Sequence, residues 1–362
     1  MTSSLHKKPA TKTGAGASRI AHDLLRWYDA NARTLPWRVP PGSNEAPDPY
    51  RVWLSEIMLQ QTTVAAVKPY FDGFTARWPD VAALAAAPDA DVLAAWAGLG
   101  YYARARNLIA CARMVAGAGG AFPETEEGLR ALPGVGAYTA AAIAAIAFGQ
   151  RAVAVDANVE RVVSRLFAIA DPLPASRPAI REAADSITPD ARAGDFAQAM
   201  MDLGSSVCTS REPECLICPL QGDCIGHASG IAASLPVKAA KKPKPQRSGT
   251  AYWIERDGHV LLVRRPAKGM LAGMRALPDD GWAARRDGDG VPPADGGWRD
   301  SGACVRHVFT HFVLDMRISA MRDAPPAMAE RLDGEWWVID RLDDAGLPTL
   351  FANAARAMSK CE

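Results

Sequence analysis

LPGVG, at residues 132–136, is the stretch that decides how this chain folds. It separates two helical segments, and the second of these is the Ala-rich run Ala137–Phe148. Glycines at Gly134 and Gly136 let backbone N–H groups converge at the N-terminus of that helix, which makes a ready site for a phosphate. A plain Gly-rich helix turn has the same pattern, so the stretch by itself indicates a helical hairpin and leaves its use open.

The chain outward from this hairpin divides by composition. Residues 19–226 are rich in Ala and Leu with helical spacing, and Asp48-Pro49 is a strong helix start. Residues 227–250 are basic and Pro-containing, which is typical of a linker. Residues 251–362 predict a separate α+β domain, with strands at Ala251–Glu255, His259–Arg264, Val305–Leu314 and Glu335–Ile339, a tight turn at Asp257-Gly258 and a helix over Leu350–Lys360.

Length and charge bound the class of protein. A chain of 362 residues with 49% hydrophobic residues is long enough for two domains with substantial cores. Its formal net charge of +1 neither requires nor excludes nucleic acid. The longest run of small apolar residues, Ala140–Phe148, is too short to span a membrane. Residues 1–18 are polar and lack an apolar core, so we expect a disordered tail and not a signal peptide.

Four cysteines gather within seventeen residues, in the spacing C-x6-C-x2-C-x5-C, and they are Cys208, Cys215, Cys218 and Cys224. Thiolates are soft ligands, so this spacing indicates a metal site or an iron–sulfur cluster rather than a disulfide framework. Zinc satisfies four thiolates as well as a 4Fe–4S cluster does. A zinc site more often has two C-x2-C pairs, and the single pair here favours iron–sulfur. A closed site of this kind is expected to have a structural rather than a redox role.

Two carboxylates lie at positions where a catalytic role is possible, and they are Asp156 and Glu56. Asp156 opens a helix soon after the hairpin. At that position it is either only the N-cap of the helix or also a functional carboxylate. Glu56 lies on a helix, and its neighbours one turn away include Val52, Trp53 and Leu59. An apolar environment disfavours the ionised form, so we expect the pKa of Glu56 to rise and the residue to act as a proton donor. An ordinary exposed glutamate is the alternative.

The order of these motifs resembles the helix-hairpin-helix DNA glycosylase superfamily over about residues 18–226. The motifs are SEIMLQQT at 55–62, GLGYYARA at 98–105, LPGVGAYTA at 132–140, VDANVERV at 155–162 and then the cysteines. The resemblance implies that the hairpin residues Leu132, Gly134, Val135 and Gly136 bind the DNA backbone. It also implies that Asp156 is catalytic and that the cysteines hold a 4Fe–4S cluster in a DNA-contacting loop, with Arg211 nearby.

Within this superfamily the residue at position 138 distinguishes two branches. Endonuclease III-type enzymes have a lysine there, which forms a Schiff base with the sugar, whereas this chain has Tyr138. The chain therefore resembles the adenine DNA glycosylase family, MutY-type, which removes adenine paired with 8-oxoguanine. The resemblance implies that Glu56 protonates the adenine, that Asp156 stabilises an oxocarbenium-like sugar, and that Asn158 and Tyr138 hold Asp156 and the nucleotide.

Further positions take their expected roles from the same resemblance. Gln61 and Tyr101 align with residues that wedge into the duplex beside the flipped base, although a helix-end polar residue and a core aromatic are the plain alternatives. The residues expected around the adenine are Arg33, Trp37, Leu59 and Gln198.

The C-terminal domain resembles the Nudix-like lesion-recognition domain of that family. Phe309, Thr310 and His311 match a Phe-Ser-His loop that contacts 8-oxoguanine, with Thr in place of Ser. A second family segment matches at residues 264–278, and beyond it there is no Glu-rich sequence of the kind a Nudix hydrolase uses to bind magnesium. We therefore expect a domain that reads the lesion and does not hydrolyse nucleotides.

The leading prediction is a monofunctional adenine glycosylase that acts on double-stranded DNA, monomeric, without a membrane partner, and cytoplasmic at the bacterial nucleoid. Repair and replication proteins are further partners that the resemblance allows. The alternatives are an endonuclease III-type glycosylase with AP lyase activity, a nucleotide pyrophosphohydrolase, and a non-catalytic DNA-binding iron–sulfur protein. Tyr138 opposes the first, the missing acidic helix opposes the second, and the pairing of Glu56 with Asp156 opposes the third.

Overall fold

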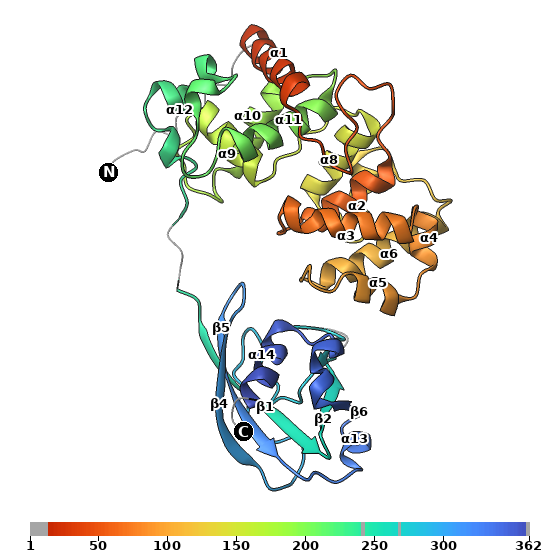
Figure 1. The fold of residues 1–362 in the computed structure, drawn as a ribbon. Coiled ribbons are helices and arrows are strands. Elements are labelled where there is room, and N and C mark those ends of the chain that lie inside the picture. Colours follow the sequence, from red (N-terminus) through yellow and green to blue (C-terminus); the bar gives the residue numbers. More distant parts are fainter. Residues whose placement is uncertain (1–13, 240–242, 267–268, 360–362) are drawn as a thin grey trace. The chain divides into compact units, whose positions relative to one another are not determined.

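The chain divides into two compact units, Met1–Ala240 and Lys241–Glu362, each described here by itself (Figure 1). A computed structural model describes residues 14–239, 243–266 and 269–359. The first unit is helical, as the sequence predicts. Its helices are α1 (Gly14–Asn31), α2 (Pro49–Leu59), α3 (Val64–Arg77), α4 (Val81–Ala86), α5 (Asp89–Ala95), α6 (Ala103–Gly117), α7 (Glu126–Arg130), α8 (Ala137–Phe148), α9 (Ala157–Leu166), α10 (Arg177–Ile187), α11 (Ala193–Ser206) and α12 (Ile225–Ala228).

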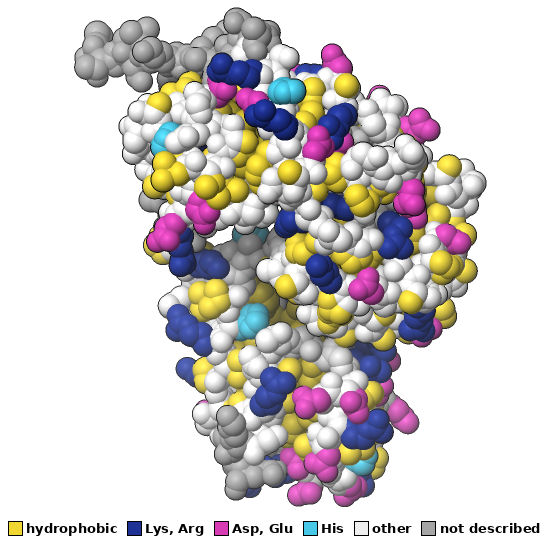
Figure 2. All heavy atoms as spheres, turned by 45° about the horizontal axis from the view of Figure 1, so that its top comes forward, with side chains coloured by type: hydrophobic (Ala, Val, Ile, Leu, Met, Phe, Trp, Pro, Cys, Tyr) yellow, Lys and Arg dark blue, Asp and Glu magenta, His cyan; other side chains and the backbone are white. Residues whose placement is uncertain are grey.

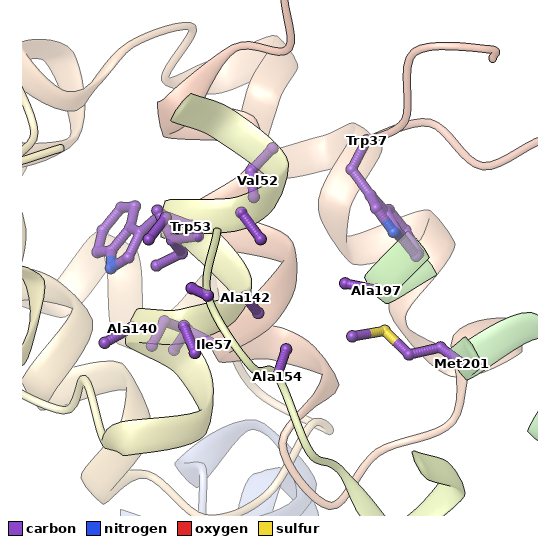
Figure 3. Packing of buried hydrophobic residues seen from close by; sticks show 14 of the residues in the cluster. Trp37, Val52, Trp53, Ile57, Ala140, Ala142, Ala154, Ala197 and Met201 are labelled. Atoms are coloured by element: carbon purple, nitrogen blue, oxygen red, sulfur yellow. The ribbon is translucent and has the colours of Figure 1, made fainter. Parts of the chain in front are cut away.

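Helix α8 lies at the centre of this unit and packs against α2, α7 and α11. Its sequence is apolar all round and most of its side chains are buried, which is typical of a helix enclosed by others. Alanine occupies most positions, so neighbouring helices can approach closely. Figure 3 shows Ala140 and Ala142 near Trp53 and Ile57 of α2. The helix after the LPGVG stretch is therefore enclosed by α2, α7 and α11.

Local signals in the sequence start two of these helices as predicted. Asp48 caps α2, because its Oδ1 accepts a hydrogen bond of 2.8 Å from the Tyr50 N–H, and Pro49 occupies the first position. Asp156 caps α9 in the same way through the Val159 N–H, at 2.7 Å. The cap interpretation of Asp156 is therefore confirmed, and a cap leaves its other carboxylate oxygen available to further partners.

Two boundaries differ from the sequence prediction. Helix α1 begins at Gly14, so residues 14–18 of the expected disordered tail belong to a helix, and residues 1–13 lie outside the described residues. The expected linker over residues 227–250 is also too long. Helix α12 and a short 3-10 turn at Ala232–Ser234 occupy its beginning, and strand β1 occupies its end from Gln246.

The second unit contains a mixed sheet with the strand order β3-β2-β1-β5-β4, and β6 pairs with β2. Strands β1 and β5 are parallel, with Gln246 opposite Val313, and the other pairs are antiparallel. Helix α14 packs against β4. The elements are β1 (Gln246–Arg256), β2 (His259–Arg264), β3 (Arg275–Ala276), β4 (Arg299–Val308), β5 (Val313–Met321), α13 (Met328–Arg331), β6 (Gly334–Val338) and α14 (Thr349–Met358).

In this unit, turns explain why one prediction from the sequence is confirmed and another is wrong. The predicted hairpin at Asp257-Gly258 is confirmed, because both residues have positive φ and β1 pairs antiparallel with β2 beside them. The single strand predicted over Val305–Leu314 is wrong. The chain reverses at residues 309–312, between β4 and β5, because the Phe309 N–H donates to the Phe312 carbonyl at 2.9 Å and closes a tight loop.

Among the described residues, no helix is long and apolar enough to cross a bilayer. Acidic and basic side chains are interspersed on the face shown in Figure 2, in keeping with the near-neutral net charge.

Candidate active site

A cavity of about 1050 Å³ opens in the helical unit between α2, α8, α9 and α11. The residues that line it come from segments far apart in the sequence. It brings together most of the residues that the sequence singles out for catalysis and base binding, namely Glu56, Tyr138, Asp156, Asn158, Gln61, Arg33, Trp37, Leu59 and Gln198.

Glu56 is buried, with 7% of its surface exposed, on the face of α2 that lines the cavity. Burial raises the pKa of Glu56 to about 7. A hydrogen bond from Tyr138 and the charge of Arg38 lower this pKa, whereas the charge of Asp156 raises it further. The residue is thus present in both protonation states near neutral pH, which suits a group that first donates a proton and then accepts one.

Asp156 is held rigidly at the first turn of α9. One carboxylate oxygen accepts from the Val159 N–H at 2.7 Å, and the other accepts from the Asn158 amide at 2.7 Å. Asn158 is fixed in turn by Arg161, which donates to its Oδ1 at 2.9 Å. Because every donor around the carboxylate belongs to one helix turn, its direction toward the cavity follows from the local fold.

Tyr138 lies at the start of α8, lines the same cavity as the two carboxylates and is hydrogen-bonded to Glu56. Burial and then the charges of Glu56 and Asp156 raise its pKa well above the ordinary value, so the phenol stays protonated. Its hydroxyl also contacts the Met201 sulfur at 3.8 Å. The side chain can donate a hydrogen bond into the site, but it offers no amine for a Schiff base.

A charged residue of the cavity wall, Arg38, and its buried partner Asp202 escaped the sequence analysis. Asp202, with 1% of its surface exposed, accepts from Arg33 at 2.6 Å and from Arg38 at 2.7 Å. Arg38 lines the cavity and opposes the rise in the pKa of Glu56 and of Tyr138. A signal did exist, because Asp202 follows Gln198 by one helical turn on α11 and so lies on the same face.

Helix α9 also contacts the cysteine loop. Arg161 donates to the Cys208 carbonyl at 2.8 Å, and Arg165 donates to the Cys208 sulfur at 3.2 Å and to the Thr209 carbonyl at 2.6 Å. Arg165 is 1% exposed. Both arginines were missed in the sequence, although they lie one turn apart on the helix that begins at Asp156.

The four cysteines line a common small cavity and form no disulfide. Cys208 lies just after the end of α11, whereas Cys215, Cys218 and Cys224 lie on or next to two short 3-10 turns, Cys215–Ile217 and Gln221–Asp223. Among the described residues, no group of three or more His, Cys, Asp or Glu side chains converges closely enough for a single metal ion. Four soft donors around one cavity, with an arginine N–H directed at one sulfur, are compatible with a bound iron–sulfur cluster.

The expected DNA-contacting residues differ in their exposure. Gln61 and Tyr101 are exposed, whereas the hairpin side chains Leu132 and Val135 are buried. The Val135 N–H donates to the Leu132 carbonyl at 3.2 Å and is used within the turn. Gly134 has φ of 76°, and Gly136 precedes α8 as its N-cap. Arg211 is exposed beside the cysteines.

The loop between β4 and β5 presents Thr310 and His311 to solvent above an aromatic base. Phe309 and Phe312 stack with ring centroids 4.7 Å apart, and Phe312 is buried. Lys244 donates to the Phe309 carbonyl at 2.7 Å. Two polar side chains are therefore exposed at the tip of a loop whose base is packed by the stacked rings of Phe309 and Phe312.

Comparison with known proteins places the chain. Residues 54–188 match the HhH-GPD superfamily of base excision DNA repair proteins, and residues 249–357 match the NUDIX domain. The adenine DNA glycosylase of Mycobacterium tuberculosis is 43% identical over 276 residues, which cover 73% of this chain and 85% of that relative. The chain belongs to the adenine DNA glycosylase family. The endonuclease III-type alternative is not favoured.

Other members of the adenine DNA glycosylase family are longer. The human adenine DNA glycosylase is 39% identical over 313 residues, and the aligned region covers 72% of this chain but only 57% of the human protein. Among solved structures, a thermostable thymine-DNA glycosylase matches with a TM-score of 0.52 and 28% identity, covering 59% of this chain and 98% of that one.

Replacing Glu56 with Gln should change how stability depends on pH. The raised pKa means that the folded protein binds more protons than the unfolded chain between about pH 4.5 and about pH 7, so the stabilising contribution of the neutral carboxyl is lost as the pH rises through that window. The free energy of unfolding of Glu56→Gln relative to the parent should therefore rise between pH 4.5 and 8, by about 3 kcal/mol at most.

Denaturant unfolding across this pH range measures the difference. Glu127→Gln, at an exposed position, is the control and should run parallel to the parent protein. Parallel curves for Glu56→Gln as well would show that Glu56 does not have a raised pKa.

Gly204→Ala should displace the start of α9, which carries Asp156, and destabilise the protein. A Cβ at Gly204 of α11 would lie 2.6 Å from the Asn158 Cβ, so the start of α9 would have to move. We expect a loss of stability of about 1–3 kcal/mol, measured by denaturant unfolding. Gly73→Ala in α3 meets nothing within 4 Å and should be neutral or stabilising. Equal stability of the two variants would contradict the close approach of α9 and α11.

Proposed function

We propose that this chain is a monofunctional adenine DNA glycosylase, which removes adenine mispaired with 8-oxoguanine or guanine from duplex DNA by hydrolysing the N-glycosidic bond. The observation that carries the proposal is the buried Glu56, with a pKa of about 7, which lines the same cavity as the fixed carboxylate of Asp156. Two carboxyl groups with separated roles are the usual solution for cleaving a glycosidic bond. Family membership supports the choice of adenine.

The chemistry proceeds by protonation and then hydrolysis. Adenine leaves poorly until a ring nitrogen is protonated, and neutral Glu56 supplies that proton from an apolar wall. Departure of the base leaves an oxocarbenium-like sugar, which the carboxylate of Asp156 stabilises. Glu56, now ionised, accepts a proton from the attacking water. Asn158 fixes Asp156 through the hydrogen bond that its amide donates, and Tyr138, which donates to Glu56, helps to hold the nucleotide.

The adenine must leave the base stack to reach this cavity. Gln61, which lines the cavity, and the exposed Tyr101 are the residues that we assign to the wedge. Arg33, Trp37, Leu59 and Gln198 line the cavity and receive the base, and the buried amide of Gln198 is able to donate to and accept from a purine edge.

DNA binding outside the pocket falls to the hairpin and the cysteine loop. Because Leu132 and Val135 are buried, the hairpin contacts a phosphate through backbone N–H groups at Gly134 and Gly136 rather than through side chains. Cys208, Cys215, Cys218 and Cys224 are proposed to bind a 4Fe–4S cluster, which shapes the loop that carries Arg211. This assignment rests on the soft donors around one cavity and on the family.

The second unit is proposed to read the lesion. The hydroxyl of Thr310 and the imidazole of His311 are exposed at the loop tip, and the stacked Phe309 and Phe312 limit its movement. Between β3 and β4, where the acidic helix of a hydrolase would follow the 264–278 segment, the described structure has no helix and the sequence has no glutamate. A recognition role through the loop is therefore better supported than nucleotide hydrolysis.

Glu56→Gln should abolish excision, with a loss of about a thousandfold, while binding to the lesion duplex persists. The assay incubates the purified chain with duplexes bearing adenine opposite 8-oxoguanine, guanine or thymine, under single-turnover conditions. The general acid must be protonated, so the parent rate should fall as the pH rises above about 7. A substantially active Glu56→Gln variant would remove Glu56 from this role.

The same assay separates the reaction classes. Strand breaks should appear only after alkali treatment, because Tyr138 cannot form a Schiff base. Breaks without alkali would contradict a monofunctional enzyme, and the absence of adenine release from every duplex would overturn the glycosylase assignment.

Replacing Thr310 and His311 together with Ala should reduce discrimination more than turnover. The rate ratio between adenine opposite 8-oxoguanine and adenine opposite guanine should fall by about tenfold, the equivalent of one or two hydrogen bonds. The half-buried Ser319 of β5 donates to the Arg299 carbonyl of the neighbouring strand, away from the loop, and Ser319→Ala serves as the control. An unchanged ratio in the double variant would refute the recognition role of the loop.

A further inference from the structure

Two strained residues protrude from two separate loops of the helical unit. Gln61, in the loop at residues 60–63, has φ of 59°, and Tyr101, in the loop at residues 97–102, has φ of 50°. Both side chains are exposed, and Tyr101 has 53% of its surface accessible. Non-glycine residues in this conformation persist only where the surrounding structure enforces it. These two segments are called the wedge loops below.

One buried side chain, Arg104, lies behind both wedge loops. It is on the first turn of α6 and has 9% of its surface exposed. On the side of the first loop, Nη1 donates to the carbonyls of Ile57 at 3.2 Å and Met58 at 2.9 Å, and Nη2 donates to the Thr62 hydroxyl at 3.2 Å. The guanidinium thus joins the last turn of α2 to the loop that carries Gln61.

The same guanidinium also holds the backbone of the second wedge loop. Nη2 donates to the Leu99 carbonyl at 3.0 Å and to the Gly100 carbonyl at 3.4 Å. The Tyr101 ring lies over the guanidinium with its centroid 5.4 Å from Cζ, and Trp96 lies against it at 5.3 Å. Trp96 itself donates to the Gly100 carbonyl at 3.0 Å. The aromatic residue that protrudes therefore rests on the group that also fixes the other loop.

We propose that Arg104 is a positioning residue that couples the two wedge loops, so that Gln61 and Tyr101 enter the duplex as one preorganised unit and base extrusion depends on their common anchor. This inference rests on the proposed function. Only a planar fork reaches acceptors in both loops at once. A lysine at this position keeps the charge but presents it as a single point, so the two loops become independent of each other.

Arg104→Lys separates extrusion from chemistry. Single-turnover excision of adenine paired with 8-oxoguanine should fall by about tenfold or more, because ordering of both loops is lost. Excision of an adenine placed in a loop of unpaired bases, which needs no extrusion, should stay within about twofold of the parent. With 2-aminopurine in place of the adenine, the fluorescence rise on binding should be slowed by a similar factor.

Arg113→Lys is the matched control. Arg113 is on the same helix and donates to carbonyls at the end of α4 and to Asp89, away from both loops. It should leave both substrates unchanged. Equal losses for Arg104→Lys on paired and unpaired adenine, or no loss on either, would overturn the coupling role. If the parent chain excises no adenine at all, the proposed function fails, while the 2-aminopurine signal still tests whether extrusion depends on Arg104.

Thermal unfolding shows whether Arg104→Lys still folds. If it does not, Thr62→Val decides the question, because it removes one acceptor of the Arg104 fork and retains the shape of the side chain. Excision of paired adenine by Thr62→Val should fall by about threefold to fivefold, with unpaired adenine unaffected. A parental rate on the paired duplex would overturn the proposal.

Discussion

Close packing around one Ala-rich helix is the constraint on which the helical unit depends. Side chains of α8 are small, so α2 and α11 lie near its axis and carry Glu56 and Gln198 to the same cavity. A larger side chain in place of one of these alanines of α8 would separate the helices and widen the cavity. Gly204 of α11 also permits close packing, because the absence of a side chain lets the first turn of α9 approach it.

Electrostatics within the cavity then follow from burial. Removal of Glu56 from water raises its pKa, and the carboxylate of Asp156 adds to this effect. Asp202 keeps Arg38 in place, and Arg38 limits the rise. The balance places the titration of Glu56 near neutral pH, where a proton donor and acceptor is most effective.

Local chemistry explains which predictions succeed. Asp48-Pro49 and Asp257-Gly258 determine a helix start and a turn through their own backbone preferences, and both are confirmed. The strand over Val305–Leu314 fails because alternation and β-propensity do not reveal a reversal closed by Phe309 and Phe312. Arg38 and Asp202 were missed because charged residues are ordinarily exposed, and only the fold shows that Arg38, at the cavity wall, pairs with the buried Asp202.

The sequence by itself determined the residue types that chemistry needs: two carboxylates without a lysine at position 138, four thiols in tight spacing, and a Gly-rich turn before an Ala-rich helix. These properties are local, because they depend on neighbours within a turn or a motif. Only the tertiary structure decided that Glu56 and Asp156 line one cavity and that one arginine joins two strained loops. Those properties arise from segments distant in the chain, since burial, desolvation and shared hydrogen-bond donors come into being only when the helices pack.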